Sequence, residues 1–267
     1  MSGADDLHAY YEQGAEVDRL DEPAGQVEFL RTTEVLSEHL PLPPAVVADV
    51  GGGPGRYALW LAELGYDVHH RDRVPLHVEQ LRGSDAGGRV DSAVCDARAL
   101  DLPDASVDAV LLLGPLYHLA ARTDRVQALA EARRVGRPGA LVVAAVISRW
   151  APRLDGVLTQ RLYREHPQIR ELVDVAETDG LLPPLFPGSF TGNTHRPDDL
   201  REEVAAAGLV VEDLVGVEGM SFAVADLGER LADPVDREVV LEAARAVQRV
   251  PELLGLSQHL LAVARVP

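Results

Sequence analysis

Hydrophobic and polar positions form two alternating kinds of segment over the first two thirds of the chain. Short, nearly continuous apolar runs rich in β-branched residues are typical of parallel strands covered on both faces. Between them, apolar residues recur at spacings of three and four, as along one face of a surface helix. The strand-like runs are 45–50, 66–70, 90–95, 107–113 and 140–147, and the helical patterns are 56–64, 76–81 and 122–135. This alternation predicts a doubly wound α/β fold.

The two ends of the chain add further elements to this core. Helical patterns at 4–20 and 26–39 predict an N-terminal helical arm, and the proline-rich stretch after the fifth strand predicts a helical cap. A helix over 197–207 that ends at Gly208, and strands over 209–217 and 259–266, complete the fold. We therefore expect four parts: an arm (1–40), an α/β core (41–147), a cap (148–196) and the C-terminal part of the core (197–267).

Charge and composition exclude several classes of protein. The 267 residues carry 25 basic and 43 acidic side chains, a net charge of −18, which disfavours a nucleic-acid partner. Every basic residue is arginine, so chemistry that needs a lysine, such as a pyridoxal Schiff base or a Walker A site, is absent. Cys95 is the single cysteine, and the start lacks the apolar stretch of a secretion signal, so we expect a cytoplasmic protein. No apolar run approaches the ~20 residues of a membrane span.

A glycine-rich loop follows the first predicted strand, in the run Asp49-Val50-Gly51-Gly52-Gly53-Pro54-Gly55. Glycine lets the chain turn sharply off the strand and lets a ligand approach the backbone, while the next helix offers free amides. Asp72 closes the following strand 21 positions after Gly51. That spacing suits a carboxylate that accepts hydrogen bonds from ribose hydroxyls. The residues predict a ligand that contains a nucleoside.

The dinucleotide fingerprint of nicotinamide enzymes fits this loop only in part. It requires glycine at its first, third and sixth positions, and counting from Gly51 the sixth position is Arg56. An NAD(P)-dependent oxidoreductase therefore remains an alternative. A second alternative is a cofactor-bound protein that kept the fold without transferring a methyl group.

The glycine run also resembles the first motif of the class I S-adenosylmethionine-dependent methyltransferases, Asp/Glu-x-Gly-x-Gly-x-Gly. Further motifs of that family follow in order: Asp72 at the ribose acid, Cys95-Asp96-Ala97 where the adenine is held, Leu102-Pro103-Asp104 through Ser106-Val107-Asp108, and Arg134-Val135-Gly136-Arg137-Pro138-Gly139-Ala140. Gly136 and Ala140 depart from the last motif. The resemblance covers roughly residues 45–147. Both ends of the chain show a looser resemblance to small-molecule methyltransferases of specialised metabolism.

The resemblance implies a Rossmann-like seven-stranded sheet with its last strand antiparallel, S-adenosylmethionine as cofactor, and methyl transfer to oxygen, nitrogen or a nucleophilic carbon of a small organic acceptor. It implies these cofactor contacts: Tyr11, Arg19, Gly51, Gly52, Gly53, Asp72, Arg73, Asp96, Ala97 and Gly114. The fork of Arg19 suits the methionyl carboxylate. The alternative is a solvated helix in which Arg19 pairs with Asp18 or Glu16.

Two residues just past the fourth strand are candidates for the chemistry. His118 is the candidate base and Tyr117 its neighbour, because an open α/β sheet presents this position to its crevice. The alternative is a histidine that only packs beside the next helix. Trp150, Phe190 and His195 are candidates for the acceptor pocket, although aromatic residues also serve plain packing.

Other histidines give no functional signal. We interpret His69, His70 and His77 as ordinary residues of a strand and a helix, and no spacing of ligands predicts a metal site. The sequence does not name the acceptor or the methylated atom, and it leaves a homo-oligomer open.

Overall fold

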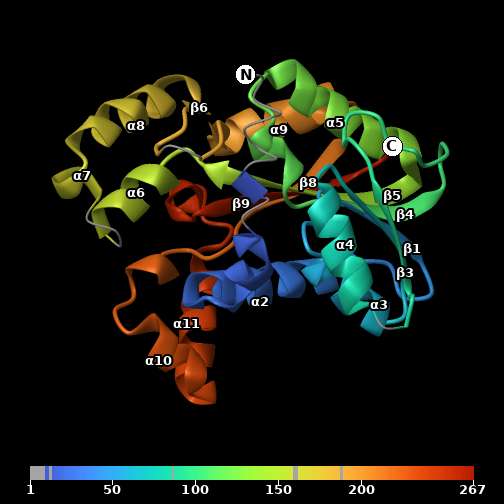
Figure 1. Ribbon diagram of the computed structural model, residues 1–267, viewed down its shortest axis with the longest axis horizontal. Coiled ribbons are helices and arrows are strands. Elements are labelled where there is room, and N and C mark those ends of the chain that lie inside the picture. Colours follow the sequence, from blue (N-terminus) through green and yellow to red (C-terminus); the bar gives the residue numbers. More distant parts are fainter. Residues whose placement is uncertain (1–9, 12–13, 86, 159–161, 187–188) are drawn as a thin grey trace.

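The computed structural model describes residues 10–11, 14–85, 87–158, 162–186 and 189–267. A central sheet has helices on both faces (Figure 1). The strands are β1 (Val46–Val50), β2 (Asp67–Asp72), β3 (Val90–Val94), β4 (Val107–Leu112), β5 (Gly136–Ser148), β6 (Leu181–Leu182), β7 (Gly192–His195), β8 (Val210–Gly216) and β9 (His259–Arg265). The longer helices are α2 (Pro23–His39), α3 (Arg56–Glu63), α4 (Pro75–Ser84), α5 (Arg122–Val135), α6 (Ala151–Leu158), α8 (Pro167–Asp179), α9 (Pro197–Ala206) and α11 (Pro234–Val247). Shorter helical segments are η1 (Ala15–Asp21), η2 (Pro115–His118), α7 (Leu162–Glu165), η3 (Ser221–Ala223), α10 (Leu227–Ala232) and η4 (Leu254–Leu256).

The main sheet has the order β3-β2-β1-β4-β5-β9-β8. The first five of these strands are parallel to one another, and β9 runs antiparallel to both β5 and β8. This arrangement confirms the predicted seven-stranded Rossmann-like sheet with an antiparallel last strand. A short hairpin of β6 and β7 joins the sheet where β7 pairs with Ile147 and Ser148, the last two residues of β5.

Both faces of the central strands are buried, which explains their continuous apolar runs. Neighbouring residues of one strand belong to different core layers: Val110 and Val142 pack on one face, and Leu111 and Val143 on the other. Helices α5 and α9 cover the first face through Leu129 and other buried residues, and α2 and α3 cover the second. A strand buried on both sides has no polar positions to alternate with, so its sequence shows no period of two.

The arm differs in detail from its prediction. Within the predicted helix 4–20, Tyr10 and Tyr11 are helical and η1 is a 3-10 helix, while residues 1–9 and 12–13 lie outside the described residues. Helix α2 begins at Pro23, three residues before the predicted start. Proline favours the first turn of a helix because the amide it lacks would have no partner there.

The cap contains α6, α7, α8 and the β6–β7 hairpin, at the upper left of Figure 1. The sequence analysis predicted no element between 217 and 259, where the structure has α10 and α11. These helices pack against α2 through a small separate core of Val27, Leu231, Val240 and Leu241, and they form the lower lobe of Figure 1.

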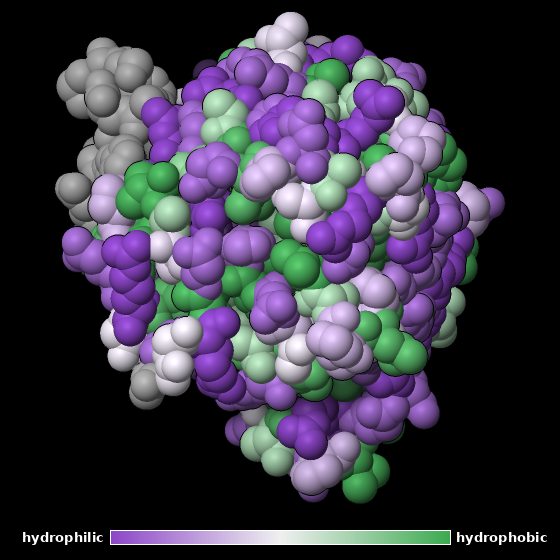
Figure 2. Space-filling view, turned by 90° about the vertical axis from the view of Figure 1, so that its right-hand side faces the viewer, coloured by the Kyte–Doolittle hydropathy of each residue, from purple (hydrophilic) through white to green (hydrophobic). Residues whose placement is uncertain are grey.

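Among the described residues, no helix is both long enough and apolar enough to span a membrane. The face turned to the viewer in Figure 2, which is the right-hand side of Figure 1, shows hydrophilic side chains interspersed with smaller groups of hydrophobic ones.

Candidate functional site

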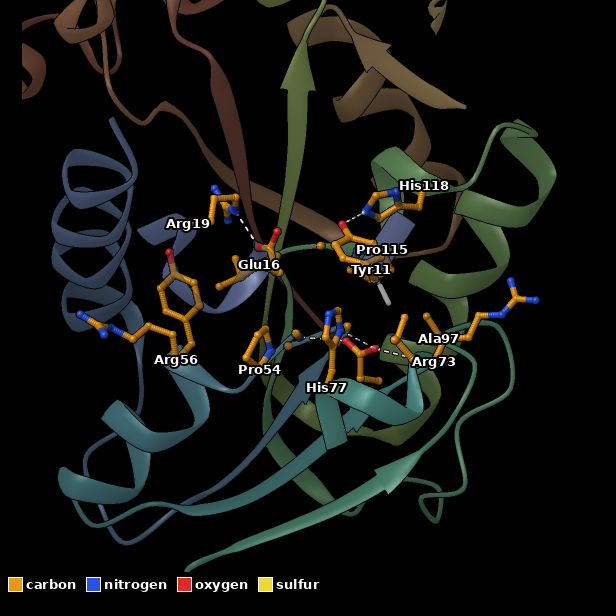
Figure 3. A pocket seen from close by; sticks show the side chains of 18 of the residues that line it. Tyr11, Glu16, Arg19, Pro54, Arg56, Arg73, His77, Ala97, Pro115 and His118 are labelled. Atoms are coloured by element: carbon orange, nitrogen blue, oxygen red, sulfur yellow. Dashed lines mark hydrogen bonds and ion pairs between the residues drawn. The ribbon is translucent and has the colours of Figure 1, made fainter. Parts of the chain in front are cut away.

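A cavity lies at the carboxyl ends of the parallel strands, where an open α/β sheet binds its ligands (Figure 3). Its wall is formed by the glycine loop after β1 and by residues at the ends of the next three strands. These are Asp72 and Arg73 at β2, Asp96 and Ala97 at β3, and Leu113, Gly114, Pro115, Tyr117 and His118 at β4. The arm closes it with Tyr11, Glu16, Arg19 and neighbouring residues. The structure thus brings twelve predicted site residues together: Tyr11, Arg19, Gly51, Gly52, Gly53, Asp72, Arg73, Asp96, Ala97, Gly114, Tyr117 and His118.

The glycine loop has no room for side chains at two positions. Gly51 has a φ of +68°, and a Cβ there would lie 2.7 Å from Cδ of Pro115. A Cβ on Gly52 would lie 2.3 Å from Oδ2 of Asp49. Gly53, in contrast, has a φ of +57° with open space where its side chain would be. The loop therefore offers bare backbone to the cavity, and Gly53 requires glycine because of its left-handed conformation.

Asp72 connects this loop to the end of β2. Its Oδ2 accepts a hydrogen bond of 2.8 Å from the Gly53 amide, and its Oδ1 accepts from the amide of Val74 at 2.7 Å and from Nδ1 of His77 at 3.2 Å. Burial alone would raise the pKa of Asp72, but His77 and the two amides together hold it below its usual range. Asp72 is therefore ionised in a buried position.

Asp49, on β1 just before the loop, has a raised pKa, in contrast to Asp72. Burial raises the pKa of its carboxyl to about 7, the neighbouring Asp72 carboxylate adds to the effect, and the amide of Ala58 opposes it. The two acids differ because Asp72 has three hydrogen-bond donors, whereas neither oxygen of Asp49 has a donor at hydrogen-bond distance among the described residues.

Asp96 lies at the β3 end of the cavity and is held by Arg98. The Nε and backbone amide of Arg98 donate to Oδ1 of Asp96 at 3.0 and 2.9 Å, and its Nη2 donates to Oδ2 at 2.7 Å. These hydrogen bonds lower the pKa of Asp96. The buried Ala97 and the half-buried Cys95 also line this end of the cavity.

Arg19 of the arm is already paired with two carboxylates. Its Nη1 and Nη2 donate to Glu28 at 2.6 and 3.1 Å, and its Nε donates to Glu16 at 2.6 Å. Burial would lower the pKa of Arg19, but both glutamates raise it above its ordinary value. The Glu16 pair that the sequence offered as an alternative is thus present, and Arg19 still lines the cavity.

The arm touches the post-β4 segment through Tyr11 and His118. The Tyr11 hydroxyl lies 2.8 Å from Nε2 of His118, while Nδ1 of His118 is buried without a hydrogen-bond partner among the described residues. Burial lowers the pKa of His118 to about 3. Burial also raises the pKa of Tyr117 and of Tyr11. All three groups are therefore neutral near pH 7, and His118 is a weak base in this state.

The three predicted acceptor residues lie outside the cavity lining. Phe190 covers the site from the cap, with its ring centroid 4.5 Å from that of His118 and 5.0 Å from that of Tyr10. Trp150 is 40% exposed beside Gly255. His195, the last residue of β7, is buried, and its Nε2 lies 3.1 Å from Glu203.

Sequence reasoning missed His77, Glu16 and Glu28, which also line the cavity. His77 was interpreted as an ordinary helix residue, yet it bonds to Asp72 and packs edge-on against Tyr11, with 4.9 Å between the ring centroids. One signal was present: His77 is five positions after Asp72, in the first turns of the helix that follows β2. The glutamates gave no such signal, because their place depends on how the arm folds over the core.

Glu28, Glu218 and His259 bring three metal-ligating atoms within 4.8 Å of one another. Burial alone would lower the pKa of His259, but the two glutamates raise it to about 9. A protonated imidazole has no lone pair for a metal. Glu218 also accepts from the Ser257 hydroxyl, and Glu28 from Arg19. We interpret the cluster as a buried ion-pair network.

Comparisons with known proteins agree with this geometry. The family of methyltransferase domains matches residues 48–144, the segment from the end of β1 to the middle of β5. The methyltransferase GfsG of Streptomyces halstedii is 32% identical over 163 residues, which are 58% of this chain and 55% of that protein. Residues 48–144 are therefore a methyltransferase domain. The chain spans about half the length of the curated methyltransferases it matches.

Solved methyltransferase structures share the fold over nearly the whole chain. An S-adenosylmethionine-dependent methyltransferase from Thermotoga maritima has a TM-score of 0.62 at 16% identity and covers 97% of this chain and 99% of its own. The 1,6-didemethyltoxoflavin N1-methyltransferase of Burkholderia thailandensis, with its substrate and S-adenosylhomocysteine bound, has a TM-score of 0.57 at 19% identity and covers 98% of this chain and 86% of its own.

The residues that line the cavity fit an S-adenosyl cofactor. The loop lines the cavity with glycine backbone, and at Gly53 only Cγ of Glu16, at 3.9 Å, lies within 4 Å of the place of a Cβ. The ionised Asp72 lines the same space. Nε2 of His77 has no hydrogen-bond partner among the described residues, so it can form a hydrogen bond with a ligand. A nucleoside with free hydroxyl groups has the chemistry that these groups require.

Proposed function

We propose that this methyltransferase transfers a methyl group from S-adenosylmethionine to oxygen, nitrogen or a nucleophilic carbon of a small organic acceptor. The observation that carries the proposal is the continuous cavity from the Gly51–Gly53 loop and Asp72 to Tyr117 and His118. One end has the groups for a nucleoside, and the other has neutral hydrogen-bonding side chains beside the arm. The toxoflavin enzyme, which shares the fold and has a small substrate bound, supports a small acceptor.

The cofactor supplies an activated methyl group, so the protein has mainly to align the acceptor with it. We propose that Gly51, Gly52, Gly53, Asp72, Asp96, Ala97 and Gly114 hold the cofactor, with Tyr11 and Arg19 closing over it. Arg73 also lines the cavity. In Figure 3 its guanidinium points away from the other labelled side chains. His118 and Tyr117 are proposed to contact the acceptor.

The low pKa of His118 favours an orienting role over that of a strong base. A neutral imidazole can still accept a hydrogen bond from the acceptor once Tyr11 shifts, and the acceptor's proton can leave to solvent. Phe190 remains a proposed acceptor contact because its ring packs on His118. Trp150 and His195 lie outside the cavity lining and would need movement of the cap to reach it.

The proposed division of labour follows the expected parts of the chain: the core of residues 41–147 holds the cofactor, and the arm and the cap cover the acceptor. We also propose the cytoplasm as the compartment, because a single cysteine cannot form an internal disulfide.

The test is incubation of the purified protein with S-adenosylmethionine labelled in its methyl group and a panel of small alcohols, phenols, amines and enolisable ketones. We expect label in one chemical class of acceptor, with one S-adenosylhomocysteine formed per label transferred. Binding of the cofactor without label transfer across a broad panel would support a non-methylating protein. Binding of a nicotinamide dinucleotide in place of S-adenosylmethionine would support the oxidoreductase.

A further inference from the structure

The carboxylate of Asp72 has little remaining capacity for a ligand. A carboxylate offers about four lone-pair positions to donors. Three are taken by the Gly53 amide, the Val74 amide and Nδ1 of His77. The position that remains suits a single hydroxyl group, whereas a ribose presents two neighbouring hydroxyls. A ribose held at Asp72 therefore requires a second acceptor close by.

His77 offers such an acceptor. Asp72 is ionised and can only accept, so the hydrogen of its bond to His77 is on Nδ1. In a neutral imidazole with its hydrogen on Nδ1, Nε2 carries a lone pair. That atom is buried and has no hydrogen-bond partner among the described residues, in a side chain that is 3% exposed and lines the cavity. A buried polar atom without a partner is costly, so a donor from a ligand is favoured there.

Packing fixes the orientation of the His77 ring. The bond to Asp72 holds one edge, and the ring of Tyr11 packs against it at an interplanar angle of 72°. His77 thus lies between Asp72 and Tyr11 of the arm. Figure 3 shows His77 and Tyr11 in the wall of the same pocket. A side chain held on two sides presents its remaining nitrogen in one direction, which is what recognition of a single hydroxyl requires.

We propose that Asp72 and His77 divide the ribose of the cofactor between them, with Asp72 accepting a hydrogen bond from one hydroxyl and Nε2 of His77 accepting one from the other. This proposal rests on the proposed function, since it requires an S-adenosyl ligand in the cavity. It makes His77 a residue that recognises the ribose. The affinity for the cofactor then depends on both hydroxyls, each bound by a different side chain.

The test compares the binding of S-adenosylhomocysteine and of its 2′-deoxy and 3′-deoxy analogues by calorimetry. In His77→Asn the side-chain amide takes the place of Nδ1, so it keeps a donor for Asp72 and loses the acceptor at Nε2. We expect this variant to bind S-adenosylhomocysteine about tenfold more weakly, the scale of one lost hydrogen bond to a ligand. One deoxy analogue should bind the variant and the wild type equally, because its missing hydroxyl is the partner of His77.

Two further variants separate recognition from folding. His69→Asn is the matched control, since Nδ1 of His69 lies 2.8 Å from the Asp91 carboxylate in the same way, but His69 does not line the cavity. It should bind all three ligands like the wild type. In His77→Gln the amide takes the place of Nε2, so this variant should recover discrimination between the two deoxy analogues.

The outcomes distinguish this proposal from the proposed function. Unchanged affinity in His77→Asn, or an equal loss with all three ligands, would overturn the role of His77 while leaving the cofactor assignment intact. Failure of the wild type itself to bind S-adenosylhomocysteine would overturn the proposed function.

Discussion

The backbone amide of Gly53 donates a hydrogen bond of 2.8 Å to the carboxylate of Asp72, so the loop after β1 and the end of β2 hold each other in place. The sequence separates these residues by 19 positions, and parallel pairing of β1 with β2 brings them together. Asp72 therefore has two roles: it shapes the glycine loop, and it presents a charge to the cavity.

Replacing Asp72 with alanine should weaken the binding of S-adenosylhomocysteine by roughly 1.5 to 3 kcal/mol, the scale of charged hydrogen bonds to a ligand. It should also lower the melting temperature, because the Gly53 and Val74 amides and His77 lose their shared partner. Calorimetry and thermal unfolding measure the two effects. Asp91→Ala, at a carboxylate that is 59% exposed on the next strand, is the control. A folded Asp72→Ala protein with wild-type affinity would show that Asp72 serves the loop alone.

S-adenosylmethionine and S-adenosylhomocysteine should raise the melting temperature, and NADH should not. A ligand that binds only the folded state stabilises it by about 2.7 kcal/mol at a hundredfold excess over its dissociation constant, which is roughly 5 to 10 °C for a chain of this size. Differential scanning fluorimetry measures the shift. Equal shifts with both kinds of ligand, or a shift with NADH alone, would contradict the cofactor assignment.

The parts of the fold and of the site that could be predicted are those marked by residue patterns within a short segment of the sequence. The doubly wound α/β class followed from strand-like runs separated by helical patterns, and the seven-stranded sheet followed from the family resemblance. The glycine loop with Asp72 followed from glycines that permit a sharp turn and from the spacing of the acid. Helices α10 and α11 also had a signal, because apolar residues such as Leu231 and Leu241 recur there at helical spacing, but no element was predicted for this segment.

Contacts between distant segments had no such signal. The pairing of Arg19 with Glu28 and the contact of Tyr11 with His118 depend on how the arm lies across the sheet edge. His195 shows the converse: it was a candidate for the acceptor pocket, but its Nε2 lies 3.1 Å from Glu203, which also accepts from Arg125, so it belongs to a buried charged cluster. A sequence pattern does not show which buried partner a polar side chain finds.

Replacing Gly52 with alanine should destabilise the protein by roughly 1 to 3 kcal/mol, as overpacking of a close-packed site does. The new methyl group would lie 2.3 Å from the Asp49 carboxylate and 2.7 Å from the ring of His70, and both residues are buried. Gly83→Ala is the matched control, because nothing lies within 4 Å of a Cβ at that helical position. Urea unfolding compares the two variants. Equal stability of both would mean that the loop relaxes freely around Gly52.

The carboxyl of Asp49 should make stability depend on pH. Its pKa is raised from 3.8 to about 7 by burial, so the folded state favours the protonated form. Its contribution is therefore most favourable at low pH and is lost as the pH rises toward 7. Asp49→Asn carries no titrating group, so its stability relative to wild type should increase by about 2 to 3 kcal/mol between pH 5 and pH 8.

Urea unfolding without ligand at the two pH values measures this difference. Asp67→Asn, at an exposed position of β2, should show no comparable change. A difference between Asp49→Asn and wild type that stays constant with pH would show that Asp49 ionises normally in the folded protein.

Replacing His118 tests whether this residue orients the acceptor or removes its proton. Burial lowers the pKa of His118 to about 3, so the imidazole is neutral throughout the range from pH 5.5 to 8 and has little affinity for a proton. His118→Ala should lower turnover ~100-fold by removing the group that positions the acceptor and Tyr11, with cofactor affinity nearly unchanged. His118→Gln can place an amide near Nε2, within reach of the Tyr11 hydroxyl, and should keep much of the turnover with a pH profile parallel to that of the wild type. If the wild type shows an inflection between pH 6 and 7 that His118→Gln lacks, His118 acts as a base, and the bound acceptor must then raise the pKa of its imidazole. If His118→Ala is fully active, the histidine only packs against Tyr11 and Phe190, and Tyr117 becomes the residue to replace next.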